Sequence, residues 1–137
     1  MNVAIYTLVD SNVLIDMLWL DPAWGQWSSA AMADAADEGK LVINQIVYAE
    51  VSTSFADISE FDAVLDEHDL IQAAMPWSAA FLAGKVHRDY RGRGGTKTAT
   101  LPDFFIGAHA AVSKLRLLTR DSTRYRTYFP TVELLAP

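Results

Sequence analysis

The stretch of sequence that decides the fold is Tyr6-Thr7-Leu8-Val9-Asp10-Ser11-Asn12-Val13-Leu14-Ile15-Asp16. The apolar run over residues 3–9 is short and rich in β-branched residues, which is typical of a strand buried on both faces of a parallel sheet. Asp10 and the next two residues favour caps and turns, and a helical pattern follows at Val13. A carboxylate is therefore expected at the carboxyl end of a central strand, where open α/β sheets bind ligands. Taken alone, this aspartate is explained equally well as a helix N-cap.

Strand-like and helix-like segments alternate along the rest of the chain. Further strands are expected at 41–43, 114–119 and 131–135, and residues 70–74 fit either a short strand or an extended connector. Helices are expected at 23–38, 46–55, 57–67, 76–90 and 103–113. The first of these long helices ends at Gly39, which fits a C′ glycine. The alternation predicts an α/β fold, with a mostly parallel sheet of about five strands flanked by helices on both faces.

Composition narrows the class of protein. A chain of 137 residues fits one domain, residues 1–137, and its 51% hydrophobic and 20% charged residues are typical of a compact protein. The absence of cysteine excludes disulfides and thiolate metal sites. No apolar run approaches the roughly 20 residues that span a bilayer, and no basic region precedes the first apolar run as in a signal peptide. We therefore expect a cytoplasmic protein with no membrane partner.

Charge is divided unevenly along the chain, whose net charge is −6. Residues 1–84 hold one lysine against thirteen Asp and Glu, whereas residues 85–126 hold ten Lys and Arg against three Asp. The basic segment suggests a phosphate-facing surface, although solvated helix faces would explain it equally well. Its glycine-rich loop, residues 91–100, lacks the spacing of a P-loop and is expected to form a mobile basic flap. The candidate phosphate contacts in this loop are Arg91, Arg93 and Lys97.

Four carboxylates stand where a closed sheet would bring them together. Two follow strands, one begins a helix and one lies within a helix: Asp10, Asp121, Asp103 and Glu50. Carboxylates this close cannot all stay ionised without a cation between them. Oxygen ligands in a chain without cysteine favour Mg²⁺ or Mn²⁺. One or two such ions can activate water and stabilise the attacking and leaving oxygens of a phosphodiester displacement.

The same residues lie in four blocks that resemble those of a PIN domain. The blocks are Val9-Asp10-Ser11-Asn12-Val13-Leu14-Ile15, Ala49-Glu50, Leu101-Pro102-Asp103-Phe104-Phe105-Ile106-Gly107-Ala108-His109-Ala110 and Leu118-Thr119-Arg120-Asp121. Each block alone is weak evidence for the family. The order and spacing of the four blocks and the overall length of the chain, however, match those of a PIN domain across essentially the whole chain. The tail, residues 119–132, is especially similar to the small VapC-type toxins of bacterial toxin–antitoxin pairs.

The resemblance implies a metal-dependent endoribonuclease that is a toxin and uses Mg²⁺ or Mn²⁺. It implies that the catalytic acids are Asp10, Glu50, Asp103 and Asp121, with Asp10, Asp103 and Asp121 as metal ligands. Asn12 and Thr119 match polar positions beside the metal. RNA would be the substrate, and the charge of the basic loop makes Arg91, Arg93 and Lys97 the candidates for contacting its phosphates. The resemblance further implies a homodimer and a cognate antitoxin protein that wraps the toxin and blocks its active site.

Other functions stay open from the sequence. The acidic pocket would also suit a PIN-like binding module that holds a cation or a partner's arginine, or a nuclease that processes RNA without being a toxin. A Mg²⁺-dependent phosphohydrolase is less favoured, because its strand-end Asp usually needs a second Asp two residues later, where this chain has Asn12. His109 is expected to be a packed histidine. Asp16 is expected at the surface or beside the site.

Overall fold

The structure, a computed structural model, describes residues 5–137, so the start of the predicted strand at residues 3–9 lies outside the described residues. Within them, five strands form one parallel sheet: β1 (Tyr6–Val9), β2 (Lys40–Ile43), β3 (Leu70–Gln72), β4 (Arg116–Leu118) and β5 (Leu134–Leu135). The strand order is β3-β2-β1-β4-β5. The predicted parallel α/β fold is confirmed, and residues 70–72 form a strand rather than a connector.

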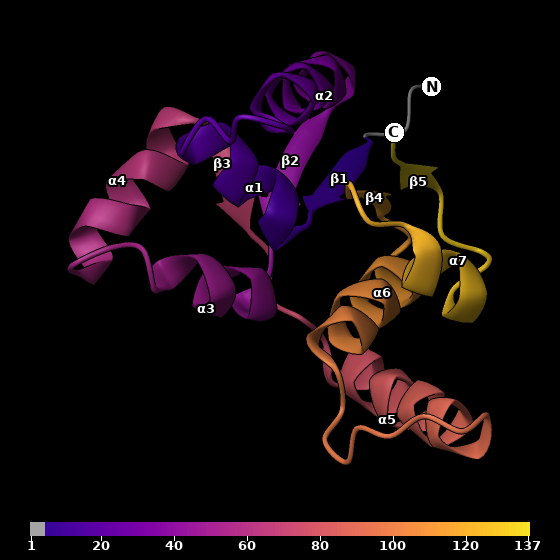
Figure 1. The fold of residues 1–137 in the computed structure, drawn as a ribbon. Coiled ribbons are helices and arrows are strands. Elements are labelled where there is room, and N and C mark those ends of the chain that lie inside the picture. Colours follow the sequence, from indigo (N-terminus) through magenta and orange to yellow (C-terminus); the bar gives the residue numbers. More distant parts are fainter. Residues whose placement is uncertain (1–4) are drawn as a thin grey trace.

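Seven helices of the described chain connect these strands. They are α1 (Ser11–Leu18), α2 (Gly25–Glu38), α3 (Gln45–Ser52), α4 (Ile58–Glu67), α5 (Trp77–Gly92), α6 (Pro102–Ser113) and α7 (Thr123–Tyr128). The chain moves outward from β1 to β3 and then crosses back to β4 and β5, so right-handed crossovers place the helices of the two halves on opposite faces of the sheet. Figure 1 shows the two groups apart, with α1–α4 on the side of β2 and β3, α6 and α7 near β4 and β5, and α5 packed on the far side of α6.

The core lies on both faces of the central strands. In β1, Leu8 and Val9 are completely buried, and the neighbouring residues Val42 and Leu117 are buried as well. Side chains of a strand alternate between its two faces, so burial of consecutive residues means that both faces are covered. This explains the continuous apolar run that the sequence has in place of an alternating pattern.

Side chains and backbone geometry set the helix boundaries. The Asn44 side chain caps α3 by accepting a hydrogen bond of 3.0 Å from the backbone N–H of Val47. In the same way, the Asp57 side chain caps α4 by accepting a hydrogen bond of 2.9 Å from the backbone N–H of Glu60. Gly39 ends α2 as predicted, and its backbone there is extended, with a φ of 176°.

Close packing explains why residue 39 is a glycine. A Cβ atom at Gly39 would overlap the carbonyl oxygen of Ile5, which accepts a hydrogen bond of 2.8 Å from the backbone N–H of Lys40. The left-handed helix end belongs instead to Lys114, with φ 55°, after α6. This turn delays the start of β4 to Arg116, so the strand is shorter than predicted.

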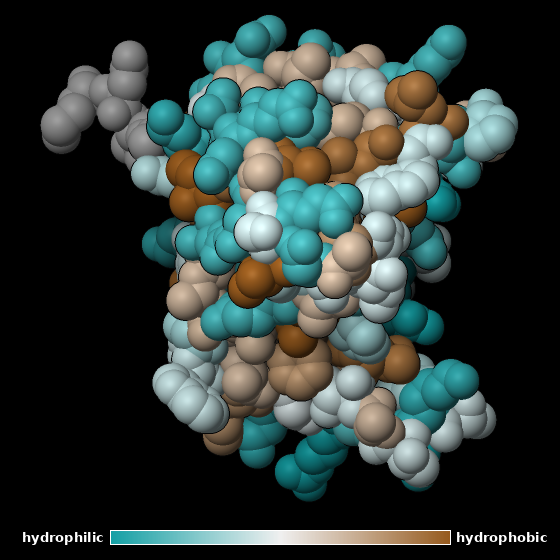
Figure 2. Space-filling model, turned by 90° about the vertical axis from the view of Figure 1, so that its left-hand side faces the viewer, coloured by the Kyte–Doolittle hydropathy of each residue, from teal (hydrophilic) through white to brown (hydrophobic). Residues whose placement is uncertain are grey.

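The surface over α1, α3 and α4 carries both hydrophobic and hydrophilic side chains (Figure 2). Small hydrophobic patches lie between hydrophilic residues, and the large apolar side chains exposed on these elements and their connections include Trp19, Leu20 and Ile58. Over residues 5–137, every helix is too short or too polar to cross a membrane.

The sheet reverses its order between β1 and β4. These two strands are adjacent, with Arg116 paired with Thr7, although more than a hundred residues of chain separate the end of β1 from the start of β4. The backbone N–H of Asp10 donates to the carbonyl of Leu118 at 2.9 Å, which holds the carboxyl ends of both strands together. Crevices at such a switch point are where open α/β sheets bind ligands, so the fold itself selects this edge as the candidate site.

Candidate metal centre

Asp10 is a buried carboxylate held by three hydrogen-bond donors. Its Oδ1 accepts from the backbone N–H of Ser11 at 2.8 Å, and its Oδ2 accepts from the hydroxyls of Thr119 and Tyr125, both at 2.9 Å. Burial raises the pKa of Asp10, the hydrogen bonds from Tyr125 and Thr119 lower it, and the charge of Asp103 raises it. The three donors fix the carboxylate in one orientation and favour its ionised form.

Asp103 and Glu50 approach Asp10 from two other elements. Asp103 lies in the first turn of α6, where its Oδ1 is 3.4 Å from the Tyr125 hydroxyl and its Oδ2 is 3.2 Å from Nη1 of Arg124. Glu50 lies on α3 and accepts a hydrogen bond of 3.1 Å from the Ser11 hydroxyl. Burial raises the pKa of Glu50, the Ser11 hydrogen bond lowers it, and the charges of Asp10 and Asp103 raise it. The three carboxylates therefore act on one another electrostatically.

Asp121 is the one predicted acid that the structure does not bring into this group. It is exposed, and within residues 5–137 its side chain makes no hydrogen bond or ion pair. Its backbone N–H donates to the hydroxyl of Thr119 at 3.1 Å, so the residue itself lies at the rim of the site. Three of the four predicted acids, Asp10, Glu50 and Asp103, thus lie within electrostatic reach of one another.

Thr119 and Asn12 connect the loops after β1 and β4. Thr119 is completely buried, and besides donating to Asp10 its hydroxyl oxygen lies 3.4 Å from the amide nitrogen of Asn12. The amide oxygen of Asn12 accepts from the backbone N–H of Arg120 at 3.3 Å. Both residues lie beside the acids and support the orientation of Asp10.

Tyr125 is a site residue that the sequence did not single out. It lies on α7, its side chain is 1% exposed, and its hydroxyl stands between the carboxylates of Asp10 and Asp103. Burial raises the pKa of Tyr125 far above its ordinary value, and the charges of Asp10 and Asp103 raise it further. The hydroxyl therefore stays protonated and acts as a donor.

A sequence model of the PIN domain matches residues 7–130. The chain belongs to the PIN domain family. The matched range includes all four acids and Tyr125. None of the curated proteins matches the chain. The predicted family is therefore confirmed.

Several solved structures share the fold of this PIN domain. VapBC2 from Rickettsia felis, bound to a DNA fragment from its promoter, has a TM-score of 0.74 at 16% identity, covering 97% of this chain and 99% of its own. VapBC-1 from nontypeable Haemophilus influenzae has a TM-score of 0.70 at 14% identity, covering 96% and 98%. A toxin–antitoxin complex from Klebsiella pneumoniae has a TM-score of 0.62 at 22% identity, covering 92% and 94%. At these identities the likeness shows the fold alone.

The donor atoms of this PIN domain fit a hydrated divalent ion. Within residues 5–137, no three His, Cys, Asp or Glu side chains are grouped so as to hold a metal ion between them. Mg²⁺, however, usually keeps several waters and binds through one or two carboxylates. Oδ1 of Asp10 accepts one hydrogen bond in the described structure while Oδ2 accepts two, so Oδ1 keeps an available lone pair. The pair Asp10 and Asp103 thus suits Mg²⁺ or Mn²⁺ with water completing the coordination.

Two of the predicted phosphate contacts of the basic loop, Arg91 and Arg93, are engaged with the loop backbone and with α5. Arg91 donates to the carbonyls of Thr96 and Lys97 at 3.1 and 3.3 Å, and Arg93 pairs with Asp89 at 3.1 Å. The backbone N–H groups of Thr96 and Lys97 also donate to the Tyr90 hydroxyl. These contacts tether the loop to the end of α5.

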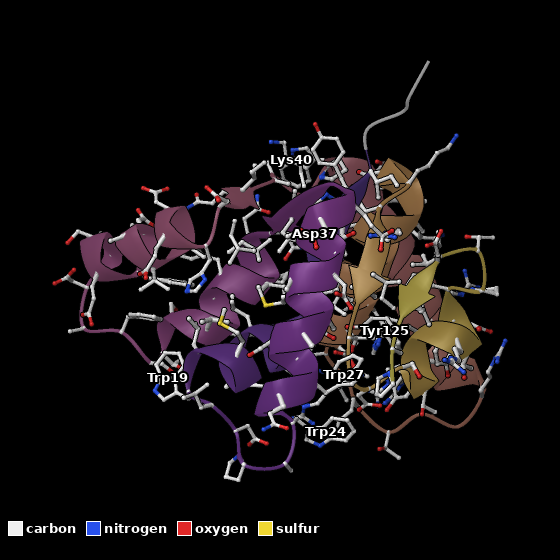
Figure 3. All side chains as sticks on the ribbon, turned by 90° about the horizontal axis from the view of Figure 1, so that it is seen from above. Trp19, Trp24, Trp27, Asp37, Lys40 and Tyr125 are labelled. Atoms are coloured by element: carbon white, nitrogen blue, oxygen red, sulfur yellow. The ribbon has the colours of Figure 1, made fainter. Side chains whose placement is uncertain are left out.

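Asp16 belongs to the support of the site rather than to its surface. It is 2% exposed and pairs with Nε of Arg120 at 2.7 Å, and the Ser28 hydroxyl donates to it at 2.9 Å. The Arg120 guanidinium also lies over the Trp24 ring, 5.7 Å from its centroid. Figure 3 shows Trp24 beside Trp27 at the start of α2, in agreement with their edge-to-face contact. The loop after β4 is therefore anchored to both α1 and α2.

His109 is packed in the core, as predicted. Its side chain is 2% exposed, and its Nδ1 is 3.2 Å from the side-chain amide nitrogen of Asn44. An amide nitrogen of this kind can only donate a hydrogen bond. Nδ1 is therefore the acceptor and the ring is neutral. Burial also lowers the pKa of His109, in agreement with a structural role.

Proposed function

We propose that this PIN domain is a metal-dependent endoribonuclease and the toxin of a toxin–antitoxin pair. The observation that carries the proposal is the convergence of Asp10, Glu50 and Asp103 at the switch point of the sheet. Paired carboxylates that need a cation are the donor set of nucleases that use Mg²⁺ or Mn²⁺. We also propose that the whole chain, residues 1–137, is one domain.

The acids would divide the work of phosphodiester hydrolysis. Asp10 and Asp103 would hold the metal, with Asp121 as a third ligand proposed from its place in the chain. A bound divalent ion lowers the pKa of water and offsets charge on the phosphate. Glu50 is suited to accept a proton from the attacking water, because its raised pKa brings it closer to neutral pH than an ordinary glutamate. Tyr125 and Thr119 keep the Asp10 carboxylate in place.

The proposed partners are RNA, an antitoxin protein and a second copy of the chain. The similar solved structures are toxin–antitoxin complexes, which supports an antitoxin. Hollows on either side of α3 and α4, both lined by Tyr48 and Ile58, offer apolar surface to such a protein. Trp77 and Phe81, exposed one turn apart on α5, support a homodimer. An RNA substrate places the proposed activity in the cytoplasm.

A binding module without catalysis is the second candidate. It is favoured by the Arg124 guanidinium, which already pairs with Asp103 and thus shows that a cationic side chain can satisfy this acid. In that case the acidic group would hold a partner's arginine or a single cation, and RNA would not be cut.

Cleavage of a panel of structured RNAs by the purified, antitoxin-free protein separates the two candidates. The reactions contain Mg²⁺, Mn²⁺ or EDTA, and Asp10→Asn protein serves as the matched control. The nuclease proposal predicts cuts that need a divalent ion and disappear in the variant. Cuts that persist in EDTA or in the variant would indicate a contaminating ribonuclease. Metal binding without any cut would favour the binding module.

A further inference from the structure

Arg124 is the cation that touches the acidic group directly. Its Nη1 lies 3.2 Å from Oδ2 of Asp103, and the two side chains are 44% and 35% exposed. Within residues 5–137, this is the one ion pair formed by any of the four predicted acids. The contact joins α7 to the first turn of α6 at the open side of the site.

We expect a divalent ion and Arg124 to compete for the Asp103 carboxylate. Oδ1 of Asp103 faces the Tyr125 hydroxyl, while Oδ2 faces the guanidinium. A metal ion bound between Asp10 and Asp103 would repel the guanidinium and need an oxygen that it now occupies. Because the ion pair is largely exposed and has a single contact, it is weak and breaks easily.

A displaced Arg124 would stand beside the reacting phosphate. Its planar guanidinium matches the oxygen geometry of a phosphate, and a side chain on short α7 stays next to the acids after it leaves Asp103. Arg91 and Arg93, first considered for this role, contact loop carbonyls and Asp89, whereas Arg124 contacts one of the acids themselves.

We propose that Arg124 is a substrate-binding residue of this site. Its guanidinium pairs with Asp103 in the metal-free protein, moves off when a divalent ion binds, and then contacts a phosphate of the RNA backbone. The proposal rests on the proposed function for its substrate class. The contact of Arg124 with Asp103 and its contact with a phosphate can nevertheless both be tested by binding measurements, without RNA cleavage.

The first test is Mn²⁺ binding to the protein without RNA, measured by titration calorimetry. Arg124→Gln removes the competing charge, so we expect Mn²⁺ to bind about two- to fivefold more tightly than to the wild type. Arg126→Gln, an exposed arginine on the same helix, is the matched control and should leave the affinity unchanged. Equal or weaker Mn²⁺ binding by Arg124→Gln would overturn the competition between metal and guanidinium.

The second test is binding of fluorescein-labelled tRNA in EDTA, with Asp103→Asn used to free Arg124 without metal. We expect Asp103→Asn to bind tRNA more tightly than the wild type does. Adding Arg124→Gln should abolish that gain. It should also reduce the steepness of the plot of log binding constant against log salt concentration by about one, as expected for one lost phosphate contact. An unchanged affinity and slope in the double variant would overturn the phosphate contact.

These outcomes are separable from the fate of the nuclease proposal. If no RNA is cut but both binding tests succeed, catalysis is wrong while the role of Arg124 stands. If RNA is cut but Arg124→Gln changes neither Mn²⁺ nor tRNA binding, the nuclease stands and the role of Arg124 is wrong. Arg124→Lys keeps the positive charge but lacks the planar guanidinium that can donate two hydrogen bonds to one phosphate. It should therefore restore part of the tRNA affinity that Arg124→Gln loses.

Discussion

Tyr125 donates its hydroxyl proton to Oδ2 of Asp10 across 2.9 Å, and both side chains are buried. The contact joins α7 to the end of β1, two elements separated by more than a hundred residues of chain. Because Oδ2 also accepts from Thr119, this oxygen is occupied and Oδ1 is left for a metal ion. The side chain that orients the central acid is therefore outside the acidic quartet itself.

Tyr125→Phe tests this relationship with the aromatic ring left in place. Removing a hydrogen bond to a buried charged group should lower the free energy of unfolding by about 1.5–3 kcal/mol at pH 7. It should also weaken Mn²⁺ binding, since Asp10 is less firmly held. Urea unfolding and titration calorimetry measure the two effects, with Tyr128→Phe as the control on the same helix. Stability and Mn²⁺ affinity equal to those of the wild type would show that the hydroxyl is unimportant.

The pH dependence of stability follows from the raised pKa values of Asp10 and Glu50. Burial raises both above the ordinary values of 3.8 and 4.5, so in this range the folded protein binds more protons than the unfolded chain. The free energy of unfolding of metal-free protein should therefore fall as the pH rises from about 4 through the folded pKa values. Glu50→Gln removes one of the two groups and should flatten this decline.

Urea unfolding in EDTA between pH 4 and 7.5 measures this decline. Glu60→Gln, an exposed acid on α4, is the control that should leave the curve unchanged. A Glu50→Gln curve parallel to that of the wild type would contradict the raised pKa of Glu50 in the folded protein.

The ion pair of Asp16 with Arg120 should be the most costly one to break. Arg120→Met leaves Asp16 buried with only the Ser28 hydroxyl as a side-chain partner, and losing one partner of a buried pair costs about 3–5 kcal/mol. Arg93→Met, at the exposed pair with Asp89, should cost less than about 1 kcal/mol. Chemical denaturation of both variants measures the difference. Equal losses would mean that burial of Asp16 carries no penalty.

Gly39→Ala should destabilise the protein, although alanine is normally the better residue next to a helix. Its Cβ would overlap the Ile5 carbonyl, so β1 and β2 must shift, at a cost of about 1–3 kcal/mol. Gly84→Ala within α5 is the matched control, because its Cβ meets no atom within 4 Å and should stabilise the protein by about 0.4–1 kcal/mol. Thermal unfolding of both variants should show opposite shifts.

The parts of the fold that depend on local pattern could be predicted from the sequence. The apolar run before Asp10, the end of the helix at Gly39 and the alternation of segments all depend on near neighbours in the chain. The boundaries of the short strands were less accurate, because tertiary contacts and the left-handed turn at Lys114 set them.

The sequence singled out three acids that the structure brings near one another and the supporting residues Asn12 and Thr119, but it did not indicate the exposed position of Asp121 or the contacts of Tyr125 and Asp16. The position of Asp10, Glu50 and Asp103 followed from strand ends and family blocks. Tyr125 could not be distinguished from Tyr128 in the sequence, since only the packing of α7 decides which of the two hydroxyls turns to the acids. The pair of Asp16 with Arg120 likewise joins residues 104 positions apart, and nothing local indicates it.

The most direct test of the account is the position of a divalent ion in crystals of the protein soaked with Mn²⁺, located by its anomalous scattering. The account predicts a peak in direct contact with the carboxylates of Asp10 and Asp103, with Oδ1 of Asp10 as a ligand and Arg124 moved away from Asp103. The same soak of Asp10→Asn crystals should show no peak there. A peak elsewhere, or none in the wild type at millimolar Mn²⁺, would contradict the metal centre on which the proposed function rests.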